Sequence, residues 1–159
     1  RGFACGVACS TLGGQALGAR RPREAEVGCR ETLRMCLFLM TGLGLVYLLF
    51  PERLARLFSD DPEVVKLVAA CLLLGGLEQP LMAVGMVLQG ALRGAGDTRS
   101  TAYVAIAGVW AVRVPCVYLA VRLGGGLVSV WAIALLDWCV RAAAYGWLYR
   151  RGRWKTVRL

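Results

Sequence analysis

The sequence contains no histidine, and none of its seven cysteines belongs to a C-x-x-C pair. Both absences argue against a zinc site, because zinc sites in proteins rely on histidines and closely spaced cysteines. Catalysis by a Cys/His pair is excluded for the same reason. Most of the cysteines lie in apolar stretches, where a thiol usually serves as a small packing residue. We therefore expect no metal site and no cofactor, and we expect that the chain is not an enzyme.

Polar side chains are also scarce for a chain of this length. Apolar residues make up 58% of the 159 residues and charged residues only 18%, whereas a soluble domain of this size needs more polar surface. The net charge of +9 is compatible with nucleic-acid binding, but the basic residues stand in short clusters between long apolar runs. Membrane proteins distribute charge in this way. We therefore expect a lipid bilayer as partner and no nucleic acid; a soluble DNA-binding domain is a distant alternative.

Five apolar stretches follow one another along the chain. About 20 residues of helix cross a bilayer, and four of the stretches are long enough, whereas the first is shorter, as a truncated span would be. The expected spans are 3–17, 33–50, 64–92, 101–121 and 127–149. They lack the strict alternation of barrel strands and the polar face of soluble helices. The sequence therefore predicts an all-α fold, a polytopic transmembrane helical bundle.

The connections between the spans carry signals of their own. The segment 18–31 is basic and amphipathic, and Pro22 suits the first turn of a short surface helix. Asp61 is a good N-cap for the third span. Lysine and arginine number five in 18–34, two in 51–63, two in 93–99, one in 122–126 and five in the tail 150–159. Because cytoplasmic loops carry the excess of Lys and Arg, the richer alternate segments, including the tail and the C-terminus, are predicted to be cytoplasmic.

The segment LQGALRGAGDTRST, residues 88–101, ends a long apolar run with glycines and charges. A phosphate-binding P-loop needs a strand before its glycines and Lys-Ser/Thr after them, and the sequence offers neither. A dinucleotide-binding fingerprint also requires a preceding strand. Gly94 and Gly96 instead predict a tight turn between two spans. Asp97 is expected to cap the next helix or to pair with the neighbouring arginines.

Two segments resemble a known family. LQGALRGAGDTR, from Leu88 to Arg99, resembles the conserved loop of the multidrug and toxic compound extrusion (MATE) transporters, and STLGGQALGARRPREA, from Ser10 to Ala25, resembles a helix end and basic loop of the same family. The ending YRRGRWK resembles the cytoplasmic end of the family's second lobe. Because the chain also begins without methionine or a signal-peptide pattern, we expect a fragment. The resemblance implies twelve spans in two lobes, with residues 1–159 as the C-terminal transmembrane lobe, holding spans eight to twelve, and the N-terminal lobe absent.

The resemblance also implies a function. MATE-type proteins are secondary active antiporters, which would export small organic cations and drugs across the cell (inner or plasma) membrane in exchange for H⁺ or Na⁺, by alternating access. One alternative is a lipid-linked oligosaccharide flippase of the same superfamily, which would line its cavity with several arginines to hold pyrophosphate. The other alternative is a non-transporting fragment with a structural role.

Four charged residues fall near the middle of the predicted spans, where an unpaired charge is costly. They are Glu78, Arg113, Asp137 and Arg141. Asp137 and Arg141 are four residues apart, on one face of a helix, and are predicted to pair with each other. Glu78 has no basic neighbour in its own helix, and Pro80 leaves a backbone carbonyl free near it. Glu78 is therefore the buried charge whose role is least explained by pairing.

These features make Glu78 the leading candidate for ion coupling. A carboxylate and a free carbonyl are good ligands for a cation or a proton, and Gln79 stands beside them. Arg113 is expected to be the partner of Glu78 or a control on its charge, with a plain salt bridge as the alternative. The candidate ion-coupling and substrate-binding residues are thus Glu78, Gln79, Arg113 and Asp137. For Gln89 we expect a hydrogen bond between helices.

Overall fold

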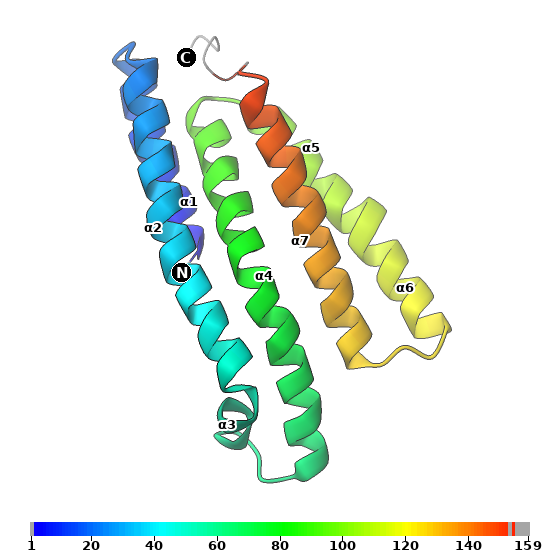
Figure 1. Ribbon diagram of the computed structural model, residues 1–159. Coiled ribbons are helices and arrows are strands. Elements are labelled where there is room, and N and C mark those ends of the chain that lie inside the picture. The colour runs from blue at the N-terminus through cyan, green and yellow to red at the C-terminus, as the bar shows by residue number, and fades with distance from the viewer. Residues whose placement is uncertain (1, 153, 155–159) are drawn as a thin grey trace.

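The computed structural model describes residues 2–152 and residue 154, and it consists of helices joined by short turns (Figure 1). No strand occurs among these residues, so the all-α prediction is confirmed. The elements are α1 (Gly2–Gly18), α2 (Pro22–Leu49), α3 (Pro51–Arg56), α4 (Pro62–Gly94), α5 (Thr98–Ala107), the π-helical segment η1 (Gly108–Arg113), α6 (Val114–Arg122) and α7 (Leu127–Arg150). Most of the predicted tail, residue 153 and residues 155–159, lies outside the described residues.

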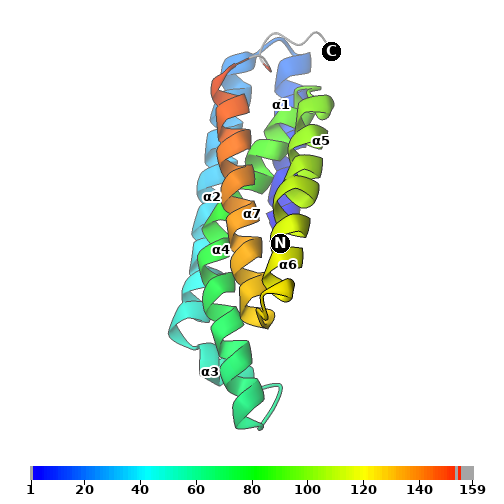
Figure 2. The ribbon, with the colours of Figure 1, turned by 90° about the vertical axis from the view of Figure 1, so that its right-hand side faces the viewer.

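Helix α4 forms the centre of the bundle (Figures 1 and 2). Helices α1 and α2 pack against one side of it and α7 packs against another. The span built from α5, η1 and α6 lies outermost, chiefly against α7. Successive long helices run in opposite directions, as short connections require. The surfaces that α4, η1 and α7 present to one another therefore come from segments that are far apart in the sequence.

Four helical spans are long and apolar enough to cross a bilayer. They are Pro22–Leu49, Pro62–Gly94, Thr98–Arg122 and Leu127–Arg150. The main difference from the predicted spans is at α2, because the expected short surface helix in 18–31 is continuous with the span that follows it. That part of the prediction was wrong. No proline interrupts the helix after Pro22, and the exposed Arg34–Glu31 pair, at 2.9 Å, supports its first turns by a few tenths of a kcal/mol.

Small residues at four-residue intervals make the contact between α1 and α4. A Cβ added at Gly90 would overlap the carbonyl oxygen of Gly6, and one added at Gly94 would overlap that of Ser10. Membrane helices that carry small residues at this spacing approach each other to backbone contact. Gly94, which was expected to form the turn with Gly96, instead ends α4 and serves with Gly90 to pack α4 against α1.

Glycine also shapes the contacts of α4 with α2 and α7. Towards α2, a Cβ added at Gly44 would lie 2.6 Å from the carbonyl oxygen of Gly76. Towards α7, the ring of Trp138 covers Gly85, where an added Cβ would lie 3.1 Å from the ring atom Cζ3. Helices α1, α2 and α7 thus each meet α4 at a glycine, and the central helix has little room for larger side chains at these positions.

The turn between α4 and α5 has the predicted chemistry. Gly96 has a φ of +85°, in the left-handed region that favours glycine. The side chain of Asp97 accepts a hydrogen bond of 3.1 Å from the backbone N–H of Ser100 and so caps α5. Asp61 does the same for α4 by accepting a bond of 2.9 Å from the N–H of Glu63. Both predicted caps are therefore confirmed.

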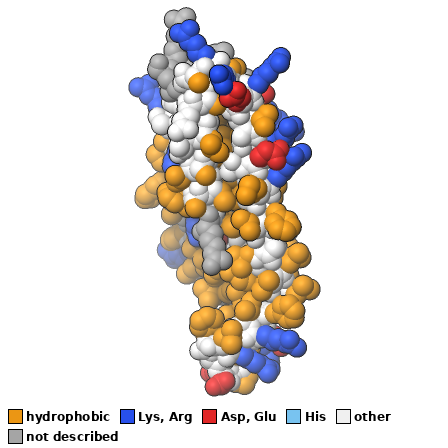
Figure 3. Space-filling view, turned by 90° about the vertical axis from the view of Figure 1, so that its left-hand side faces the viewer, with side chains coloured by type: hydrophobic (Ala, Val, Ile, Leu, Met, Phe, Trp, Pro, Cys, Tyr) orange, Lys and Arg blue, Asp and Glu red, His pale blue; other side chains and the backbone are white. Residues whose placement is uncertain are grey.

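The basic segments gather at one end of the bundle. The turn after α1, the turn between α4 and α5 and the end of α7 lie together at the top of Figure 1, whereas α3 and the turn before α7 lie towards the other end. Figure 3 shows a band of apolar side chains between two ends that carry charge. The alternating counts of Lys and Arg therefore correspond to two ends of one bundle. The assignment of the basic end to the cytoplasm stays a prediction.

Candidate functional site

A cavity of about 180 Å³ lies between α4, η1 and α7. Its lining residues are Glu78, Arg113, Val130, Trp131 and Ala134. Glu78 stands at the middle of the 33-residue helix α4, and Arg113 is the last residue of η1. The fold thus brings together two of the four predicted site residues, from spans that are separate in the sequence.

The carboxylate of Glu78 has no fixed partner in this cavity. Its side chain is half-buried, and the ion pairs formed among the described residues do not include one with Arg113. The hydrogen bonds shown for this part of the chain do not involve Glu78 either. The plain salt bridge that the sequence left open as an alternative is therefore not formed in this structure. Glu78 and Arg113 face one cavity as two separate charges.

Asp137 is fully buried and is held by Arg141. The Arg141 Nε donates to Oδ1 of Asp137 at 2.8 Å, and a second guanidinium nitrogen donates to Oδ2 at 2.7 Å. The guanidinium also lies over the ring of Trp138, 5.5 Å from its centre. The predicted pair is therefore formed, with the two-pronged geometry that favours arginine and carboxylate. Each oxygen of Asp137 accepts one of these bonds, and its role in ion coupling or substrate binding stays a prediction.

Gln79 and the carbonyl freed by Pro80 lie on the α2 side of α4, away from the cavity. A Cβ on Gly44 of α2 would lie 3.2 Å from the Cβ of Gln79 and 2.6 Å from the carbonyl oxygen of Gly76, which is the group that Pro80 leaves without its helical donor. Neighbouring residues of a helix point about 100° apart, so Glu78 and Gln79 serve different faces. The expected convergence of carboxylate, amide and carbonyl is therefore not found.

Gln89 forms a hydrogen bond between helices, as predicted, and a second bond extends this contact to a third helix. Its side-chain nitrogen donates to the hydroxyl of Tyr145 on α7 at 2.9 Å. That hydroxyl donates in turn to the backbone carbonyl of Thr101 on α5 at 3.3 Å. Tyr145 and Thr101 are both buried. A satisfied polar chain of this kind fixes the helices relative to one another at the basic end.

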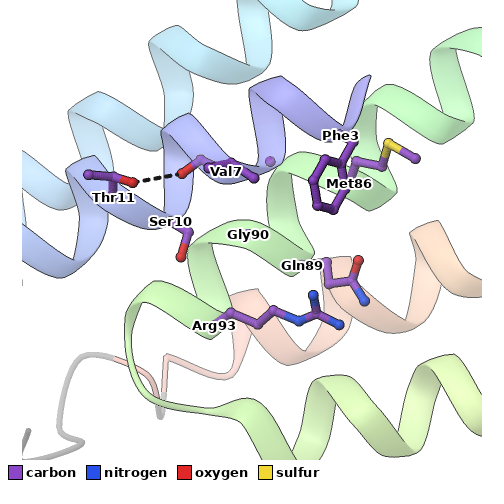
Figure 4. A pocket seen from close by; sticks show the side chains of 9 residues that line it. Phe3, Val7, Ser10, Thr11, Met86, Gln89, Gly90 and Arg93 are labelled. Atoms are coloured by element: carbon purple, nitrogen blue, oxygen red, sulfur yellow. Dashed lines mark hydrogen bonds between the residues drawn. The ribbon is translucent and has the colours of Figure 1, made fainter. Parts of the chain in front are cut away.

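A second cavity, also of about 180 Å³, opens between α1 and α4 (Figure 4). Its walls include Phe3, Val7 and Met86, and Gln89 and Arg93 extend from the same helix as Met86. The described lining residues include no acid, so this cavity suits an apolar or anionic group better than a coupling cation. Sequence reasoning did not find it, because the cavity depends on how α1 packs on α4. The four-residue spacing of small residues in both helices was the available signal.

The family comparison agrees with the fold. The MatE family model matches residues 2–119. The chain is 27% identical over 154 residues to "Probable multidrug resistance protein NorM" of Thermotoga maritima, covering 96% of this chain and 33% of that protein. It is 34% identical over 117 residues to the protein of the same name from Mannheimia succiniciproducens, covering 74% and 25%. It is 30% identical over 114 residues to "Multidrug resistance protein MdtK" of Proteus mirabilis, covering 72% and 25%. The chain thus spans a quarter to a third of the length of these relatives.

Proposed function

Because the chain belongs to the MatE family, we propose that it is the C-terminal lobe of a multidrug efflux transporter. The transporter would work as a secondary antiporter, exporting small organic cations in exchange for H⁺ or Na⁺ by alternating access between two lobes. Support comes from the apolar spans of this multi-pass membrane bundle and from relatives named as multidrug resistance proteins. The partners in this proposal are the bilayer, the exported cations and an N-terminal lobe.

One observation carries the coupling role of Glu78, namely its unpaired carboxylate in a cavity at the middle of α4. A carboxylate without a fixed partner can bind a cation or a proton and release it again. Arg113 in the same cavity wall weakens the hold on a cation, because like charges repel most strongly away from bulk water. Trp131 adds an aromatic surface on which an organic cation can rest.

The orientation of the bundle follows from its charge. The end that carries the turn after α1, the turn between α4 and α5 and the end of α7 is the richer in Lys and Arg. We place this end, with the C-terminus, in the cytoplasm of a cell whose inner or plasma membrane holds the transporter. The Glu78 cavity then lies at about mid-membrane, where alternating access can expose it to either side.

The flippase alternative receives less support from this lobe. Holding a pyrophosphate would require several cationic side chains in one cavity. Among the described residues that line the Glu78 cavity, Arg113 alone is cationic. Arg141, the other arginine near the middle of a span, is paired with Asp137. The geometry therefore favours cation export over lipid-linked pyrophosphate transport.

Glu78→Gln tests the coupling role. In energised everted vesicles that carry the intact protein, adding an organic cation should release protons from the lumen, which a pH-sensitive dye reports; a parallel sample receives Na⁺. We expect Glu78→Gln to reduce this release at least about tenfold, because an interaction with a charged group contributes about 1.5–3 kcal/mol.

Glu63→Gln is the matched control, since it makes the same change at the exposed beginning of the same helix. It should leave the response unchanged. Full proton release in Glu78→Gln would place the coupling residue elsewhere in the protein. A wild-type protein that is well inserted yet responds to no cation would contradict the efflux function itself.

A further inference from the structure

The span Thr98–Arg122 is interrupted near its middle by η1 (Gly108–Arg113). The backbone N–H of Val114 donates to the carbonyl of Val109, five residues earlier, whereas an α-helix uses a spacing of four. Pro115 follows and has no N–H to donate, so regular α-helical bonding cannot pass through this point. Short π-helical segments occur frequently at functional sites. This one ends at Arg113, in the wall of the mid-membrane cavity.

The beginning of η1 rests on the buried ion pair of α7. A Cβ added at Gly108 would lie 2.6 Å from Nε of Arg141 and 2.7 Å from Oδ1 of Asp137. Both distances are shorter than a carbon atom tolerates, so only glycine allows the backbone to come this close. Asp137 is fully buried and both its oxygens are bound by Arg141. The pair therefore offers a rigid surface on which η1 is seated.

Little of this span is buried against the bundle. Among the described residues of α5, η1 and α6, those that are buried are Thr101 and Gly108, and α6 contributes none. Thr101 is held by the hydrogen bond from Tyr145 at the basic end. Gly108 is thus the residue of η1 that is buried, and it lies against the Asp137–Arg141 pair of α7.

We infer that the Asp137–Arg141 ion pair, through its contact with Gly108, positions Arg113 opposite Glu78 and so sets how strongly Glu78 holds the coupling ion. The inference rests on the proposed coupling role of Glu78. Arg113 lies five residues beyond Gly108 in the same segment, so a shift of Gly108 relative to the ion pair also moves the Arg113 guanidinium. The interaction of two charges falls with their separation. Gly108, Asp137 and Arg141 are thus positioning residues.

Gly108→Ala is the first test variant, because its added methyl group does not fit against the ion pair. Gly42→Ala is the matched control, since nothing lies within 4 Å of a Cβ added at that glycine of α2. Arg141→Lys is a milder second variant in case Gly108→Ala fails to fold. It keeps the positive charge and loses the two-pronged bond to Asp137. All variants are made in the intact protein.

The first readout is the distance between α6 and α4, which does not depend on transport. Spin labels on noncanonical amino acids at Leu119 and Leu77, both exposed, leave the native cysteines unmodified. We expect Gly108→Ala and Arg141→Lys to shift the distance distribution measured by electron paramagnetic resonance, and Gly42→Ala to leave it in place. Distributions that coincide with wild type in the first two variants would overturn the inference.

The second readout is the ratio of protons released to organic cation exported in everted vesicles. Gly108→Ala should change this ratio about threefold or more, and should add nothing in an Arg113→Gln background, because residues acting through one another are not additive. Equal effects in both backgrounds would indicate a general packing defect and overturn the inference. If Glu78→Gln itself leaves the ratio unchanged, the proposed coupling role of Glu78 is wrong. The distance measurement then still tests whether the ion pair positions Arg113.

Discussion

Replacing Gly90 by alanine is expected to destabilise the bundle by about 3 kcal/mol, at the upper end of the range for overpacking. The methyl group would overlap the carbonyl oxygen of Gly6, which is backbone and cannot turn aside as a flexible side chain can. Helix α1 would have to move away from α4 along the whole four-residue pattern, since Gly94 makes a similar contact with Ser10. The measurement is the midpoint of SDS-induced unfolding of the intact protein in mild detergent.

Gly13→Ala provides the matched control in α1, because nothing lies within 4 Å of a Cβ added there. Alanine is the better helix former by up to about 1 kcal/mol, so this variant should be as stable as wild type or slightly more stable. The test is whether the same glycine-to-alanine change lowers the stability at Gly90 but leaves it unchanged or raises it at Gly13. If Gly90→Ala were as stable as Gly13→Ala, the close packing of α1 on α4 would be contradicted.

Removing one partner of the buried ion pair should have an effect at least as large. Asp137→Ala leaves Arg141 without its acceptor in a site where the arginine side chain is only 14% exposed. Loss of one partner of a buried pair costs about 3–5 kcal/mol. Glu31→Ala, which breaks the exposed pair with Arg34, should cost about 1 kcal/mol or less. Unfolding midpoints of the two variants give the comparison.

The double variant Asp137→Ala, Arg141→Met separates the value of the pair from the cost of an unpaired charge. Because it removes both charges and fills part of the volume, it should be more stable than Asp137→Ala alone. A double variant that loses the sum of the two single effects would indicate that the residues act independently, against the geometry of the two short hydrogen bonds.

The sequence was sufficient for the helices but not for all of their ends. Apolar runs of about 20 residues dictate membrane-length helices, and the local chemistry of Asp61, Gly96 and Asp97 dictates caps and a turn. These features depend on neighbours in the chain. The continuation of α2 back to Pro22 was not predicted, because the basic composition of its first turns differs sharply from that of the apolar span.

The detailed geometry of the candidate site was predictable only where it depends on one helix. The pairing of Asp137 with Arg141 follows from a spacing of four and is present. The separation of Gln79 from Glu78 depends on which face of α4 meets α2, which one helix cannot reveal. The meeting of Glu78 with Arg113 requires the packing of three spans and the π-helical segment. The roles of Glu78, Gln79, Arg113 and Asp137 in ion coupling or substrate binding stay predictions.

Proteoliposomes containing the purified intact protein test the central claim most directly, because they separate coupling from substrate movement. One assay measures accumulation of a labelled organic cation driven by an imposed proton or Na⁺ gradient; the other measures exchange of labelled for unlabelled cation without a gradient. If Glu78 couples ion and substrate, Glu78→Gln loses the driven accumulation and retains the exchange. A variant that keeps both activities, or that loses both while folding normally, contradicts the coupling role of Glu78.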